Sequence, residues 1–132
     1  MERLIERLTL TKKALTAYDE ILQESYSKII RDAALQRFEF TLETMWKLAQ
    51  RYLLLQEGIE TGSPKGTIRS CFQAGLIDEE QTQSLLQAVD DRNLTSHTYN
   101  EKIAENIYQH LFIYQPIFHA LYHTIFQFVH AH

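Results

Sequence analysis

The sequence predicts an all-α fold, in the form of a four-helix up-and-down bundle with one short additional helix. Glycine and proline together account for only 6 of the 132 residues, or less than about 5%. An average protein contains about 12% of the two together. Five of these six helix breakers lie between positions 58 and 75, so segments 1–57 and 76–115 contain none. Within both segments, apolar side chains recur at steps of three and four residues, the spacing of one helix face.

Composition places the chain among single-domain globular proteins, and we treat residues 1–132 as one helical domain. Hydrophobic residues make up 45% of it, too many for an intrinsically disordered chain. The net charge of −4 argues against a surface that coats nucleic acid generally, since such surfaces are basic. Cys71 is the single cysteine, which excludes an internal disulfide. Because the N-terminus lacks a signal-peptide core and no stretch resembles a membrane span, we expect a cytoplasmic protein without membrane contact.

Two helices are expected in the first segment. The first presents one apolar face, formed by Met1, Leu4, Leu8, Thr11, Leu15, Tyr18 and Leu22. The second begins near Ser27 and ends at Gly58, a residue type common just after helix C-termini. Its apolar stripe is too wide to be covered by packing along a single line of contact with one neighbouring helix. Two adjacent sets form this stripe: Phe38, Thr41, Met45, Leu48, Tyr52 and Leu55, and beside them Leu35, Leu42, Trp46, Ala49 and Leu53. We therefore expect this helix to be covered on two sides, with the second subunit of a homodimer as one candidate cover.

A short third helix and a fourth helix follow. Ser63 and Pro64 are the residue types of an N-cap and a first helical position, and Gly75 can end the third helix. Residues 78–81 (DEEQ) place acidic side chains where the dipole of a fourth helix favours them. The buried face of this fourth helix is expected to comprise Leu85, Leu86 and Val89.

The last helix is expected to begin just after His97. Thr98 and Glu101 have the spacing of a capping box, in which the two side chains satisfy backbone amides at a helix start. Apolar residues then continue along one face to Phe128. Pro116 lies within this helix and should kink it.

The polar stretch at residues 90–100 holds the side chains most suited to chemistry. Arg92 carries a planar, permanently charged guanidinium that can clamp a phosphate. His97 carries an imidazole, the side chain best suited to give or take a proton, and Tyr99 adds a hydroxyl. Arg92 and His97 together suit metal-free cleavage of an RNA phosphodiester. A structural role is the alternative: Arg92 could pair with Asp90 or with a neighbouring helix, and His97 could be a turn residue packed on the bundle.

The five-residue spacing of Arg92 and His97 also constrains the local structure. On one continuous helix the two side chains would point about 140° apart and could hardly serve one phosphate. Either the helix breaks between them, or two subunits share the site. Both arrangements place the site at the end of a helix or at a dimer interface.

Two sequence signatures point to a known family. Residues 91–100 (DRNLTSHTYN) resemble the Arg-x4-His-x-Tyr signature of HEPN domains (higher eukaryotes and prokaryotes nucleotide-binding), in which Asn commonly follows the Arg. Residues 37–47 (RFEFTLETMWK) resemble the second-helix signature of one branch, the nucleotidyltransferase substrate-binding proteins. Ser63-Pro64, residues 75–77 and the aromatic last helix fit the same pattern, so the resemblance covers nearly the whole chain.

This resemblance implies a homodimer whose partner is a separately encoded minimal nucleotidyltransferase, the two forming a toxin–antitoxin pair. Arg92 and His97 would be catalytic residues of a metal-independent endoribonuclease near the dimer cleft. Asn93 would be a binding residue, and RNA, such as a tRNA, the substrate. The partner would move AMP from Mg-ATP onto Tyr99, and the added anion would block the cleft. The chain itself would need no cofactor.

Two alternatives stay open beside this interpretation. In one, the chain is a non-catalytic subunit that binds substrate or nucleotide for the nucleotidyltransferase, and Arg92 and His97 only bind phosphate. In the other, the chain is a purely structural dimer and the polar stretch is an ordinary turn.

Other residues that could carry chemistry are assigned structural roles. His119 and His123 have the i, i+4 spacing of metal ligands, but no acidic residue follows position 105 to join them, so we expect no metal site. Cys71 lies among apolar residues and is expected to be a small buried side chain rather than a nucleophile.

Cationic and aromatic residues outside the motif have similar interpretations. Four cations of the first helix are expected to form a solvated face: Arg3, Arg7, Lys12 and Lys13. Lys65 and Arg69, near the start of the short helix, are candidate phosphate contacts. Trp46 and Tyr52 could stack on bases, but at helical spacing they are expected to be core or dimer contacts.

Overall fold

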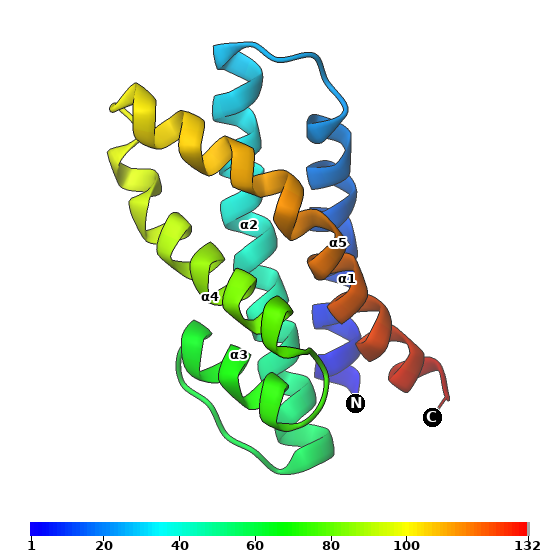
Figure 1. The fold of residues 1–132 in the computed structure, drawn as a ribbon. Helices are drawn as coiled ribbons and strands as arrows, with labels where there is room; N and C mark the ends of the chain where they lie inside the picture. Colours follow the sequence, from blue (N-terminus) through cyan, green and yellow to red (C-terminus); the bar gives the residue numbers. More distant parts are fainter. Residues whose placement is uncertain (132) are drawn as a thin grey trace.

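The computed structural model describes residues 1–131, which fold into helices joined by short connections (Figure 1). In chain order they are α1 (Glu2–Leu22), α2 (Lys28–Tyr52), α3 (Pro64–Gln73), α4 (Glu79–Leu94) and α5 (Glu101–Ala131). A single π-helical turn, Leu53–Glu57, extends α2, and a short 3₁₀ turn, Thr95–His97, follows α4. No strand occurs within residues 1–131, which confirms the predicted all-helical class.

Three helices begin where the sequence predicted, and each of these starts carries a side-chain cap. The Ser27 hydroxyl accepts a hydrogen bond from the Ile30 amide at 3.0 Å, and Ser63 caps α3 in the same way. At the start of α4, Asp78 and Gln81 exchange side chain-to-backbone hydrogen bonds in a complete capping box. Each cap satisfies backbone amides that have no partner within the helix. The local sequence was therefore sufficient to locate these starts.

Gly58 ends the extended α2, as the sequence predicted. Its φ of 67° lies in the left-handed region, which a residue without Cβ adopts without strain. The amides of Gly58 and Ile59 donate to the carbonyls of Leu54 and Leu53, both at 3.1 Å. These bonds close the π-helical turn and send the chain toward α3.

The start of α5 differs from the prediction. The helix begins at Glu101, not just after His97, and the proposed Thr98–Glu101 capping box is wrong. The Thr98 hydroxyl instead donates to the Thr95 carbonyl at 2.9 Å within the 3₁₀ turn. Asn100 caps α5, since its side-chain oxygen accepts from the amides of Lys102 and Ile103 at 3.0 and 3.3 Å.

A long-range ion pair removes Glu101 from its predicted capping role. Arg31, on α2, is almost fully buried and donates to the Glu101 carboxylate at 2.7 Å. The same guanidinium contacts Glu105 and Asp32, both at 3.0 Å. A buried guanidinium must be paired, and this requirement outweighs a surface cap.

The wide apolar stripe of α2 is covered by helices of the same chain. α2 packs against α1 and α5 as well as α3 and α4. Consequently four residues of the second apolar set are buried, and Trp46 is half-buried. The four buried residues are Leu35, Leu42 and Ala49 on α2 and Leu53 at the start of the π-helical turn. Helices of the same chain thus cover most of the stripe, whereas Leu55 at its end is 40% exposed. The up-and-down bundle arrangement and the homodimer stay predictions.

α5 remains helical through Pro116. In Figure 1 its orange first part and its red end run in different directions, as expected for a helix bent by an internal proline. Within residues 1–131, no helix is both long enough and apolar enough to cross a membrane.

Candidate functional site

The connection between α4 and α5 carries the residues of the predicted motif. Arg92 lies in the last turn of α4, whereas His97 ends the 3₁₀ turn and Tyr99 lies in the turn that follows. The α-helix ends at Leu94, so the helix breaks between Arg92 and His97, which is one of the two arrangements that their spacing allowed. The Thr95 hydroxyl donates to the Arg92 carbonyl at 2.7 Å and stabilises this end of α4.

His97 and Tyr99 lie side by side on the surface of this connection. Their ring centroids are 6.1 Å apart and the rings meet edge to face at 70°. Tyr99 is 83% exposed, and His97 is exposed as well. An accessible imidazole that can carry a proton therefore adjoins an accessible phenol oxygen. Asn93 is also exposed, on the last turn of α4.

Arg92 has a carboxylate partner on a neighbouring helix. Its Nη2 contacts the Glu43 Oε2 of α2 at 2.8 Å, while its Nε is buried without a hydrogen-bond partner. Of the two structural partners that the sequence allowed, the neighbouring helix is the correct one, because Asp90 pairs with Lys65 at 2.6 Å. Within residues 1–131, no hydrogen bond or ion pair joins Arg92 to His97.

Glu43 holds three donors at once. Besides Arg92, it accepts from the Lys47 ammonium at 3.0 Å and from the Trp46 indole at 3.2 Å. Partial burial alone would raise the pKa of the Glu43 carboxyl, but the hydrogen bonds from Lys47 and Trp46 and the charge of Arg92 lower it overall. The carboxylate is therefore charged at neutral pH and compensates Arg92.

A buried network next to Arg92 was missed by the sequence analysis. Asp91 is buried and accepts hydrogen bonds from the Tyr114 hydroxyl at 2.5 Å and from His110 Nδ1 at 2.9 Å. Burial first, and then the bond to Asp91, raises the pKa of Tyr114 well above its usual range, so the hydroxyl remains a donor. The network ties the end of α4 to α5. The i, i+4 spacing of His110 and Tyr114 was a signal for it.

The remaining candidates occupy separate places. The two predicted phosphate contacts, Lys65 and Arg69, both lie on α3. Lys65 forms an ion pair with Asp90 of α4, and Arg69 is exposed. Cys71 is buried, and burial raises the pKa of its thiol to about 12, which makes it a poor nucleophile as expected.

His119 and His123, both on α5, do not act as a pair. His119 Nε2 contacts the Asp19 carboxylate of α1 at 2.9 Å, while the exposed His123 stacks on Phe126. Asp19 is an acidic partner that the sequence of α5 alone could not reveal. No group of three His, Cys, Asp or Glu side chains suited to a metal ion occurs in the part of the chain that the structure describes.

Comparison with known proteins gives one family match. The family model described as "nucleotidyltransferase substrate binding protein like" matches residues 6–127. No curated protein matches the chain.

Solved structures resemble this chain over most of its length. A protein from Thermus thermophilus is 42% identical, with a TM-score of 0.84, over 87% of this chain and 98% of that one. A Haemophilus influenzae protein, described as having the fold of a substrate-binding domain of a nucleotidyltransferase, is 21% identical (TM-score 0.72; 89% and 98% covered). A tri-AMPylated HEPN toxin of Shewanella oneidensis, in complex with its MNT antitoxin, is 16% identical (TM-score 0.70; 94% and 96% covered). The latter two likenesses concern the fold.

Proposed function

Because the chain belongs to the family of nucleotidyltransferase substrate-binding-like proteins, we propose that it is the HEPN subunit of a two-component toxin–antitoxin pair. Its partner is a separately encoded minimal nucleotidyltransferase, and the active form is a homodimer in the cytoplasm. The Shewanella oneidensis complex is an instance of such a pairing with the same fold. In this proposal the chain is a metal-independent endoribonuclease toxin that is silenced by AMPylation of Tyr99.

His97 and Arg92 would divide the work of cleavage. The RNA 2′-hydroxyl attacks the adjacent phosphorus and the His97 imidazole takes its proton. The resulting imidazolium then gives a proton to the departing 5′-oxygen as its bond to phosphorus breaks, which leaves a 2′,3′-cyclic phosphate. Arg92 stabilises the charge that develops on the phosphate oxygens. For this it must exchange Glu43 for the phosphate, since its Nη2 is bound to that carboxylate in the free chain. Asn93, exposed beside Arg92, would help to bind the RNA.

Silencing would act through Tyr99. Its phenol oxygen attacks the α-phosphorus of ATP on the partner enzyme, pyrophosphate leaves with Mg²⁺, and the phenolic proton passes to solvent. The single observation that carries the proposal is the exposure of Tyr99, at 83%, directly beside His97. An adenylyl group there would add a bulky anion next to the imidazole and repel an RNA phosphate.

The test is RNA cleavage in EDTA by protein shown by intact mass to be unmodified. We expect the wild type to cut cellular RNA, and a His97→Ala variant prepared identically to lose at least roughly 100-fold in rate. His123→Ala is a matched control, because His123 is an exposed histidine far along α5 from the motif. Equal cleavage by wild type and His97→Ala would contradict the proposal.

The modification is tested separately. With the partner enzyme and Mg-ATP, the wild type should gain the mass of an adenylyl group and lose its ribonuclease activity. Tyr99→Phe should gain no mass at this motif and keep its activity. A Tyr99→Phe protein that is still modified between residues 90 and 100 would show that Tyr99 is not the acceptor.

A non-catalytic binding subunit is the second candidate function. The ion pair between Arg92 and Glu43 favours it, because the free chain offers RNA a compensated arginine, and the net charge is −4. In this case the unmodified protein would cleave no RNA. It would bind the nucleotidyltransferase, and Arg92→Gln would weaken only its affinity for phosphorylated ligands.

A further inference from the structure

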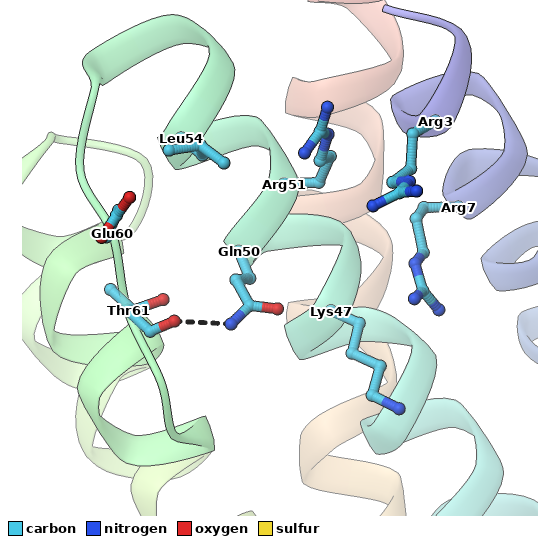
Figure 2. A pocket seen from close by; sticks show the side chains of 8 residues that line it. All are labelled: Arg3, Arg7, Lys47, Gln50, Arg51, Leu54, Glu60 and Thr61. Atoms are coloured by element: carbon cyan, nitrogen blue, oxygen red, sulfur yellow. Dashed lines mark hydrogen bonds between the residues drawn. The ribbon is translucent and has the colours of Figure 1, made fainter.

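A pocket of about 290 Å³ lies between α1, the C-terminal half of α2 and the segment that follows Gly58 (Figure 2). It contains none of the motif residues at the end of α4. Cationic side chains dominate its lining: Arg3, Arg7, Lys47 and Arg51. Figure 2 shows these side chains gathered where the two helices face each other. Arg3 and Arg7 were expected to belong to a solvated face; Arg3 is exposed, and both residues also line this pocket.

Helix geometry brings these cations together. Arg3 and Arg7 are four residues apart on α1, and Lys47 and Arg51 are four residues apart on α2, so each pair shares one helix face. Because the start of α1 lies against the later part of α2, the two faces line the same hollow (Figures 1 and 2). Four like charges converge in a chain whose net charge is −4.

Three of these charges have no partner. Lys47 is paired with Glu43, but within residues 1–131 no carboxylate lies at ion-pair distance from Arg3, Arg7 or Arg51. The Arg51 Nε is in addition buried without a hydrogen-bond acceptor. Like charges held close together repel each other, and a buried donor without an acceptor costs stability. A bound anion would remove both costs at once.

Polar groups, including the Glu60 carboxylate, shape the wall opposite α1. The Gln50 amide donates to the Thr61 carbonyl at 2.5 Å, which holds the segment after Gly58 against α2. Thr61 and Glu60 line this wall, and Figure 2 shows Glu60 on the far side of Gln50 from the α1 arginines. The pocket is therefore bounded on three sides. A bounded hollow suits a compact ligand, whereas a nucleic-acid chain needs a continuous groove.

We propose that this pocket binds a small anion with two or more linked phosphates, either a free oligophosphate or the phosphate tail of a nucleotide. A single phosphate could not compensate three unpaired guanidinium groups. Adjacent phosphates could accept paired hydrogen bonds from Arg3, Arg7 and Arg51 together, and guanidinium geometry favours such contacts. The proposal is independent of ribonuclease activity.

Isothermal titration calorimetry tests whether the pocket binds linked phosphates. The ligands are sodium tripolyphosphate, ATP in EDTA, and adenosine. The wild type should bind tripolyphosphate and ATP but not adenosine. An Arg7→Gln/Arg51→Gln variant should lose roughly 100-fold in affinity, at about tenfold for each charge-assisted contact. Lys13→Gln/Lys102→Gln is the matched control: it changes the net charge equally at exposed positions outside the pocket and should bind as the wild type does.

Circular dichroism melts of both double variants establish that they are folded. If Arg7→Gln/Arg51→Gln does not fold, the single variants replace it, each expected to lose about tenfold. Affinity of tripolyphosphate that is equal in the pocket variant and the control variant would overturn the proposal. Absence of tripolyphosphate binding to the wild type would also overturn it, as would binding of an RNA oligonucleotide at this pocket without binding of tripolyphosphate. Binding of tripolyphosphate but not ATP would assign the pocket to the free oligophosphate.

Discussion

Among the residues that the structure describes, the charged side chains at the end of α4 are paired with partners, whereas the arginines of the α1–α2 pocket are not. At the end of α4 each charged side chain has a partner: Arg92 has Glu43, Asp91 has His110 and Tyr114, and Asp90 has Lys65. In the pocket, three arginines have none within residues 1–131. Paired charges hold helices in place, whereas unpaired charges of one sign are available to a ligand.

The pairing of charges differs from what the motif suggested. Arg92 is the residue that sequence analysis selected as a phosphate clamp, yet it is compensated in the free chain. The arginines that lack partners include Arg3 and Arg7, which were expected to belong to a solvated face. Lys47 links the two regions, since it lines the pocket and shares the Glu43 carboxylate with Arg92.

The largest effect is expected at the buried carboxylate. Asp91→Ala should destabilise the fold by about 3 kcal/mol, because it leaves the buried Tyr114 hydroxyl and His110 without their acceptor. Asp90→Ala is the control, since it breaks an exposed pair with Lys65 and should cost less than about 1 kcal/mol. Urea denaturation of both variants measures the difference. Similar losses would mean that burial of Asp91 contributes little.

An intermediate effect is expected at the carboxylate that compensates Arg92. Glu43→Gln should destabilise by about 1 kcal/mol at neutral pH. Because the folded-state pKa of Glu43 is lowered, its contribution is present above the ordinary value of 4.5 and is lost as the pH falls through the lowered pKa. Urea melts from about pH 7 to about pH 3 should therefore show the wild type and the variant converging. A difference that persists at acid pH would show that Glu43 acts through packing and not through charge.

The smallest effect is expected in the pocket, and it has the opposite sign. Without ligand, Arg7→Gln should stabilise the fold by a few tenths of a kcal/mol, because it relieves repulsion from Arg3 and Arg51. The gain should shrink in high salt, which screens such repulsion. Thermal melts at low and high ionic strength measure it, with Lys13→Gln as the control. A clear loss of stability would mean that Arg7 is a structural residue.

Much of the fold was predictable from the sequence. The starts of α2, α3 and α4 and the end of α2 at Gly58 were located correctly, since each depends on residues a few positions apart. The start of α5 was misplaced because a distant residue, Arg31, binds Glu101. Local signals predict local hydrogen bonds, and they fail where a buried charge elsewhere competes for the same side chain.

By itself, the sequence determined the helical class, most helix boundaries and the motif that carries the family resemblance. Apolar periodicity and capping act over a few residues, so they can be recognised in any stretch of chain. Only the tertiary structure decided which charges meet. It placed Glu43 against Arg92, Asp91 in a buried network, and two helix faces of like charge around one pocket. Such contacts depend on which faces of distant helices pack together, and that follows from the packing of the whole core.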